Sequence, residues 1–254
     1  MATNTINENV EQAILDFGTI KQAIIDKGVE VPEGTPTSQY ATKIGEIQSG
    51  GSSSDDFKGM IERTLTEITI PSDCNTIGDG AFADFYSLTY VNIPDSVTSI
   101  GREAFQDCTN LALTSLPEGI TSIGSRSFYG CTNLTLTSLP EGITSIGAIA
   151  FYHCQNLALT SLPIDITRIE NDTFNGCSRL AITSIPGGVT YIGSTAFRNC
   201  MGLTEILFER TPNYISSDAF IGCSNLKTIY VPWAEGEVDG APWGADSASV
   251  IYKK

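Results

Sequence analysis

The residues of this chain that could carry out chemistry are its cysteines and its single histidine. The histidine, His153, directly precedes one of the cysteines, Cys154. A Cys–His nucleophile needs the imidazole and the thiol to converge on one substrate atom, with a third group holding the imidazole. Neighbours in an extended or tightly turned segment seldom converge in this way. We therefore expect His153 to be a surface side chain rather than a catalyst.

Six of the seven cysteines recur every 23 residues, at Cys108, Cys131, Cys154, Cys177, Cys200 and Cys223. Phe85 occupies the equivalent position one period earlier, so the site accepts an aromatic ring and is apolar. Cys74 falls in a different column, which otherwise holds Val or Ile. We interpret all seven as small buried hydrophobes. The alternative is a disulfide ladder, because adjacent turns would place the Cα atoms about 5 Å apart, but a column points its side chains inward rather than toward one another.

Other catalytic and metal-binding patterns are missing from the sequence. There is no CxxC pair for a metal and no GxGxxG or GxxxxGK[ST] phosphate loop. Acidic residues are numerous enough for a glycosidase pair, but no insertion interrupts the 23-residue spacing to form a cleft. We therefore expect a non-enzymatic protein with no metal site and no cofactor.

The cysteine period is the period of most of the chain. A Phe, a Leu and an Ile each recur every 23 residues, from Phe82 to Phe220, from Leu88 to Leu226 and from Ile77 to Ile215. The copies 108–130 and 131–153 are identical at 18 of 23 positions. A unit this small cannot bury its own apolar face, so successive copies must stack as turns of a solenoid. Each unit reads as two short strands and a corner. Seven turns spaced by about 4.8 Å give a right-handed coil roughly 34 Å long.

The repeats also resemble a known family. Leu88-Thr-Tyr-Val-Asn-Ile-Pro94, Val97-Thr-Ser-Ile-Gly101 and Ala104-Phe-Gln-Asp-Cys108 are similar to the BspA-like leucine-rich repeats of bacterial surface and phage proteins, over about residues 57–233. The resemblance implies a mainly β leucine-rich-repeat solenoid. Four copies depart from it by placing Thr where an apolar residue is usual, at Thr114, Thr137, Thr160 and Thr183. The residues one place earlier are expected to fill the core instead (Leu113, Leu136, Leu159 and Ile182), which leaves the strand register open.

The two near-identical copies differ at five positions, four of which crowd around the corner that carries the Phe. We predict a contiguous exposed ligand patch there, formed by Arg126, Tyr129, Ile149, Tyr152 and His153. Aromatic and basic groups of this kind are enriched at interfaces. The alternative is neutral variation on a solvated edge.

The two ends do not repeat. Residues 1–48 are expected to form a helical attachment module with a heptad seam that favours a trimer, made by Ile6, Val10, Ala13, Phe17, Ile20 and Ile24. A helix folded back on the first turn is the open alternative. Residues 49–56 read as a flexible linker, and residues 234–254 as a C-terminal cap that works with Trp233 and Trp243 over the last turn. Residues 28–47 resemble a segment of tail and other virion proteins from phages and prophages of gut-type Gram-positive bacteria.

The net charge of the chain limits the classes of binding partner that we expect. A net charge of −15 disfavours nucleic acids and anionic membranes, and no apolar run is long enough to insert into a membrane. The first residues have no basic and apolar signal, so we expect no secretory leader. Our hypothesis is a virion surface protein, such as a tail fibre or baseplate part, that attaches to other virion proteins through 1–48. Its solenoid would bind a host-surface or mucosal ligand, that is, a host-surface protein or glycan. The alternatives are a BspA-like adhesin on the bacterial cell surface and a structural spacer without a ligand.

Overall fold

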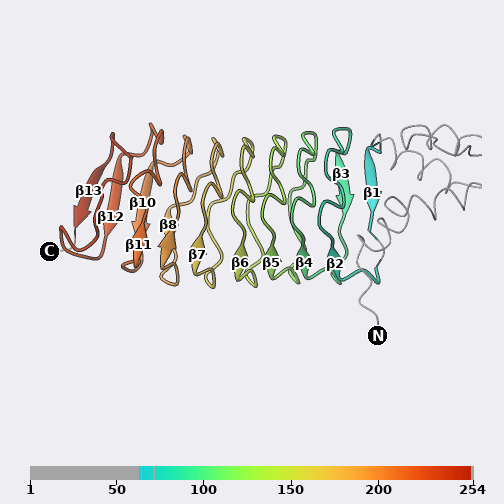
Figure 1. The fold of residues 1–254 in the computed structure, drawn as a ribbon, viewed down its shortest axis with the longest axis horizontal. Helices are drawn as coiled ribbons and strands as arrows, with labels where there is room; N and C mark the ends of the chain where they lie inside the picture. Colours follow the sequence, from blue (N-terminus) through green and yellow to red (C-terminus); the bar gives the residue numbers. More distant parts are fainter. Residues whose placement is uncertain (1–62, 64, 71, 253–254) are drawn as a thin grey trace, which may run out of the picture.

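The computed structural model describes residues 63, 65–70 and 72–252, which form a single row of turns from β1 to β13 (Figure 1). The attachment module predicted at 1–48, its oligomerisation seam and the linker at 49–56 lie outside the described residues. The described part is mainly β, contains no helix, and forms a solenoid of about eight turns with a spacing of about 23 residues. The expected fold class is confirmed, with about one turn more than the seven counted from the sequence.

One row of strands, here called the short-strand row, is built from the Thr-Ser-Ile-Gly segments and their equivalents. Its strands pair in parallel with a register of 23 residues, as Ile100 does with Ile123. Their isoleucines are buried, and the residue before each is half-buried or exposed. The strands are β2 (Thr76–Ile77), β4 (Ser99–Ile100), β5 (Ser122–Ile123), β6 (Ser145–Ile146), β7 (Arg168–Ile169), β9 (Tyr191–Ile192) and β11 (Tyr214–Ile215).

The second row, here called the long-strand row, is interrupted. It begins with β1 (Glu67–Thr69) and β3 (Tyr90–Asn92) and resumes with β8, β10, β12 and β13. The last four form one parallel sheet: β8 (Ser184–Ile185), β10 (Glu205–Phe208), β12 (Thr228–Val231) and β13 (Ser249–Tyr252). Three turns between β3 and β8 have no strand in this row (Figure 1). The expectation of two strands in every unit is therefore wrong for these turns.

The interruption follows from the order of the buried positions. In the turn of β3 the buried or partly buried residues are Leu88, Val91 and Ile93, whereas in the next turn they are Leu111, Leu113 and Leu116. In the turn of β3, Val91 follows Leu88 by three residues and Ile93 follows Val91 by two. Two residues is the spacing of side chains on one face of a strand. The spacing in the next turn, two then three, turns the residue at 114 outward and breaks that period. The turn of β8 has the same spacing and keeps only the two-residue strand Ser184–Ile185, which pairs with β10. The prediction that Leu113, Leu136, Leu159 and Ile182 fill the core in place of the threonines is confirmed, since all four are buried.

The corners stack a phenylalanine from each turn. Consecutive rings from Phe82 to Phe220 lie 5.0–5.6 Å apart and are nearly parallel. Backbone bonds join the corners as well, for example from Phe105 N–H to Ser127 O at 2.8 Å. Glycine is required where turns approach closely, because a Cβ on Gly124 would lie 2.6 Å from the carbonyl carbon of Gly101.

The C-terminal end is closed by aromatic residues. Trp243 is fully buried and Trp233 nearly so, and both pack against Phe208 with ring centroids 5.9 and 5.3 Å away. β13 then adds one more strand beside β12. Among the described residues, no helix has the length and hydropathy needed to cross a bilayer.

Candidate ligand-binding site

The structure brings three of the five predicted patch residues into one continuous stack. Tyr129 and Tyr152 occupy the same place in successive turns, and their rings lie 5.1 Å apart at an interplanar angle of 2°. The His153 ring stacks on Tyr152 at 4.4 Å and 24°. Both tyrosines are half-buried and His153 is exposed, so this stack presents aromatic edges and polar tips to solvent.

His153 and Ile149 have unusual backbone conformations. Each corner has residues in the left-handed region, and here they are Ile149 with φ 64° and His153 with φ 58°. A β-branched residue is rarely found there, because its Cβ substituents crowd the backbone. His153 lies against Gly176 of the next turn, where a Cβ would be only 3.1 Å from its Cδ2. The corner thus keeps a strained isoleucine and leaves room for the imidazole.

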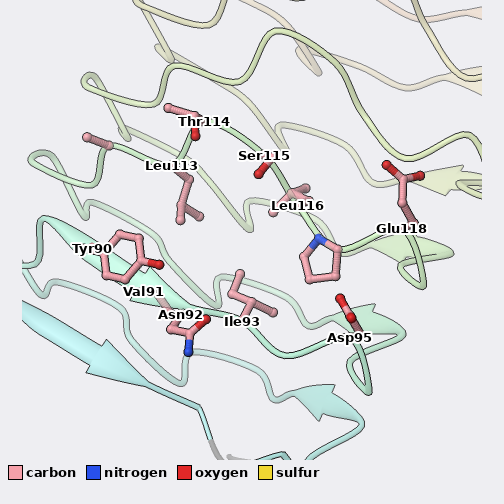
Figure 2. A pocket seen from close by; sticks show the side chains of 12 residues that line it. Tyr90, Val91, Asn92, Ile93, Asp95, Leu113, Thr114, Ser115, Leu116 and Glu118 are labelled. Atoms are coloured by element: carbon pink, nitrogen blue, oxygen red, sulfur yellow. The ribbon is translucent and has the colours of Figure 1, made fainter.

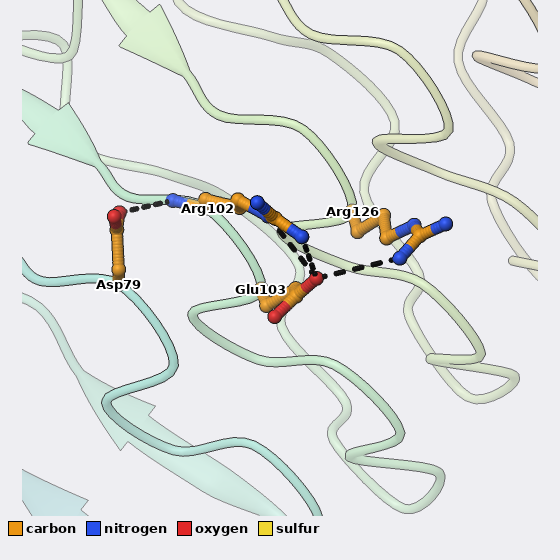
Figure 3. A network of polar contacts seen from close by, with 4 residues as sticks. All are labelled: Asp79, Arg102, Glu103 and Arg126. Carbon is orange, nitrogen blue, oxygen red and sulfur yellow. Dashed lines mark hydrogen bonds and ion pairs between the residues drawn. The ribbon is translucent and has the colours of Figure 1, made fainter.

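Arg126 lies at the edge of the patch and is partly engaged. Its Nη1 is 3.5 Å from Glu103 Oε1, which also accepts a hydrogen bond from Arg102 Nη2 at 2.9 Å (Figure 3). The backbone N–H of Arg102 donates to Asp79 Oδ1 at 2.7 Å. The side chain of Arg126 is 45% exposed, and an exposed ion pair of this length holds it only weakly. The guanidinium therefore remains available to a ligand.

A second aromatic surface was missed in the sequence analysis. The guanidinium carbon of Arg168 lies 3.9 Å from the ring centroid of Tyr191, which stacks on Tyr214 at 5.1 Å. All three lie on the short-strand row, in the column that holds Ser99, Ser122 and Ser145 in earlier turns. The change from Ser to Arg and Tyr along this column was the signal available in the sequence. The patch prediction relied on two copies that both have Ser in this column, so it did not include these residues.

The cysteines that recur every 23 residues are buried between turns and contribute to packing. Each of the six thiols donates a hydrogen bond to the carbonyl of a phenylalanine in the preceding turn, for example from Cys131 Sγ to Phe105 O at 3.0 Å. All seven cysteines are free and buried. Burial raises the pKa of Cys108 and of Cys223 to about 12, and that of Cys154 well above its usual value. These thiols are therefore poor nucleophiles.

His153 and Cys154 do not form a catalytic pair, because the thiol is fully buried while the imidazole is exposed. Within the described residues, no three His, Cys, Asp or Glu side chains are grouped so that they could hold a metal ion. The geometry suits contact with a partner through aromatic edges and hydrogen-bonding tips.

The repeats were compared with families of known proteins. The model of the BspA type leucine rich repeat region matches residues 54–181 and 106–227. This chain belongs to the BspA-type leucine-rich repeat family. The prediction made from the 23-residue motif is thus confirmed for the family, and a leucine-rich-repeat solenoid of this type is typically a non-enzymatic binding scaffold.

Two of the solved structures that match this chain are bacterial proteins. A leucine rich cell surface protein from Faecalibacterium prausnitzii is 24% identical, with a TM-score of 0.49 over 75% of this chain and 66% of its own. A leucine-rich repeat protein from Bacteroides ovatus is 27% identical, with a TM-score of 0.49 over 75% of this chain and 61% of its own. This chain therefore spans less than two thirds of either. No curated protein matches the sequence.

Proposed function

We propose that this protein is a non-enzymatic binding protein displayed on a surface, and that it contacts its ligand through the patch of Arg126, Tyr129, Ile149, Tyr152 and His153. The observation that supports this most is the stack from Tyr129 through Tyr152 to His153, with rings 5.1 and 4.4 Å apart. Stacked rings are rigid, so little side-chain entropy is lost when a partner covers them. The ligand class is a host-surface protein or glycan.

The surface that we propose is that of a virion, with the protein forming a tail fibre, baseplate or other appendage. The resemblance of residues 28–47 to virion segments supports this location. Residues 1–48 would then attach the solenoid to other virion proteins and join three copies through the seam. Three patches on one appendage would sum weak contacts into useful avidity.

A bacterial cell-surface adhesin is the second candidate. It is supported by membership of the BspA-type family, whose members are typically cell-surface proteins. Antibody labelling distinguishes the two locations. Signal on particles released by the producing strain supports the virion, and signal on washed intact cells supports the adhesin.

Binding of the labelled 254-residue chain to candidate host cells tests the patch. We expect Tyr129→Ala combined with Tyr152→Ala to lower cell-bound protein at least about tenfold, in line with the loss of two aromatic anchors. Arg198→Ala is the matched control, because Arg198 is exposed and occupies the tyrosine column two turns further along. Unchanged binding of the double variant, with an unchanged melting temperature, would reject the patch.

A further inference from the structure

A groove of about 420 Å³ runs between β3 and the following turn. One wall is formed by residues 90–93 and 95, and the other by 112–118. Figure 2 shows Tyr90 at one end of the groove and the carboxylates of Asp95 and Glu118 at the other. The groove lies on the long-strand row and shares no residue with the corner patch.

The groove exists because two kinds of turn meet here. β3 belongs to a turn with a regular strand, whereas the next turn has its buried residues at 113 and 116 and turns Thr114 and Ser115 outward. In the described chain, a single backbone hydrogen bond joins the segments 89–95 and 112–118, from Ala112 N–H to Thr89 O at 3.0 Å, just outside the groove. Strand pairing stops at β3.

The floor of the groove therefore contains free backbone groups. Tyr90 N–H donates to Thr66 O, and Asn92 O accepts from Ile70 N–H, so these two residues bond toward β1. Alternate residues of a strand direct their backbone groups to opposite sides, so the backbone N–H and C=O groups of Val91 and Ile93 point toward the groove. Within the described chain, neither their N–H groups nor those of 113–116 donate a hydrogen bond. Unpaired strand edges of this kind accept another strand.

The end of the groove is negatively charged. Asp95 and Glu118 occupy the same column in successive turns, and both are exposed. No cationic side chain among the described residues forms an ion pair with either. The chain has a net charge of −15, so its wider field favours a cationic occupant as well.

We propose that this groove binds an extended segment of a partner protein, which pairs with β3 as an added parallel or antiparallel strand and places a Lys or Arg side chain between Asp95 and Glu118. The wall from residue 90 to 95 is about 17 Å long at about 3.3 Å per residue, which accommodates about five residues of an extended chain. Main-chain bonds supply affinity in this mode, and the charged end supplies selectivity. The inference goes beyond the patch and does not depend on it.

The probe is a fluorescein-labelled, capped hexapeptide of alternating Thr and Val with Lys at its fifth position, and its twin carries Glu there. Fluorescence anisotropy measures binding to the full chain. We expect the Lys peptide to bind at least about tenfold more tightly than the Glu peptide. Glu118→Gln should weaken the Lys peptide by about two- to fivefold, as expected for an exposed charge pair. Glu141→Gln is the matched control, since Glu141 is exposed in the same column one turn outside the groove, and it should change nothing.

Two N-methylated versions of the Lys peptide test the pairing itself. One carries N-methyl groups on its odd amides and the other on its even amides. A strand bonds to one neighbour through alternate residues, so one version should lose binding and the other should keep it. Hydrogen exchange of the segment 89–94 should slow when the unmodified peptide binds.

Several results would overturn the proposal. They are failure of both the Lys and Glu peptides to bind, equal binding of the two, loss of affinity in Glu141→Gln equal to that in Glu118→Gln, and equal binding of the two N-methylated versions. Binding of an oligosaccharide array in place of the peptides, with the loss on Glu118→Gln, would assign the groove to a glycan instead. Failure of the corner-patch variants in the cell assay has no bearing on any of these outcomes.

Discussion

Truncating Phe151 should divide the solenoid into two units that unfold separately. Phe151 lies in the middle of the phenylalanine stack and is fully buried, with Phe128 at 5.4 Å and Phe174 at 5.6 Å. In a repeat array each turn contacts only its neighbours, so cooperativity depends on every interface between turns. Removing one ring weakens two consecutive interfaces at once.

The magnitude follows from the contacts. A fully buried Phe→Ala substitution costs about 3–5 kcal/mol. Phe151→Leu retains most of the buried volume and removes the two stacked pairs, which are worth about 0.5–1.5 kcal/mol each beyond their buried area, or about 1–3 kcal/mol together. Thr144→Ala is the control. Thr144 is exposed and precedes Phe151 in the same repeat, so its substitution should change the free energy of unfolding by less than about 0.5 kcal/mol.

The chain offers two probes of different reach. Both tryptophans, Trp233 and Trp243, are buried at the C-terminal end, so tryptophan fluorescence reports on that end alone. Circular dichroism reports on all turns. In urea the two transitions should coincide for the native chain. In Phe151→Ala the dichroism should be lost first, because the long-strand row has only the two-stranded sheet of β1 and β3 on the N-terminal side, while the four-stranded sheet of β8, β10, β12 and β13 protects the other half.

The reasoning would be refuted by coincident transitions in Phe151→Ala together with a loss of less than about 1 kcal/mol. The stack would then be a by-product of the period rather than the coupling between turns. An earlier loss of fluorescence than of dichroism would refute the assignment of the weaker half.

Three further predictions concern single features. Ile149→Asn should raise the melting temperature, with a gain of about 1 kcal/mol, because Asn tolerates the left-handed conformation that strains isoleucine; a lower melting temperature would contradict the strain. Trp243→Phe should cost about 1–3 kcal/mol more than Trp233→Phe in urea unfolding. Trp243 Nε1 donates to Asp239 O at 2.8 Å, whereas Trp233 Nε1 is buried without a partner among the described residues, so equal losses would contradict this. The free energy of unfolding should fall as the pH rises from about 9 toward 12. Burial raises the pKa of Cys108 and Cys223 to about 12 from the usual 9.0, so these thiols stabilise the fold fully below pH 9. Cys108→Val should reduce this dependence, and an unchanged slope would exclude the thiol as its source.

The period alone predicted most of the architecture. Residues that recur every 23 positions must occupy equivalent places in successive turns, so the columns of Phe, Leu, Ile and Cys could be assigned to the core before their contacts were known. The same argument predicted the substitution of Leu113 for Thr114 in the core. It did not predict the loss of strands that follows, because the spacing of buried residues specifies what points inward and not whether the backbone keeps the period of a strand.

The sites were less accessible to sequence reasoning. The patch that contains Tyr129, Tyr152 and His153 was predicted because two near-identical copies differ at positions next to the two tyrosines, but the stacking of the three rings was not. The surface of Arg168, Tyr191 and Tyr214 has no such pair of copies to compare. The groove beside β3 has no motif at all, since it arises from a mismatch between the backbones of two turns. Features of this kind depend on how neighbours fit, which a single repeat does not contain.

The thiol column has a consequence for how such a chain changes in length. Each Cys Sγ bonds to the turn before it, and each turn offers the same carbonyl to the turn after it. Deleting or inserting one 23-residue unit among these turns would leave every remaining contact of this type intact. The turns are thus interchangeable. An unequal exchange within the repeated coding sequence would change the length of the solenoid by about 5 Å per unit and leave the fold intact.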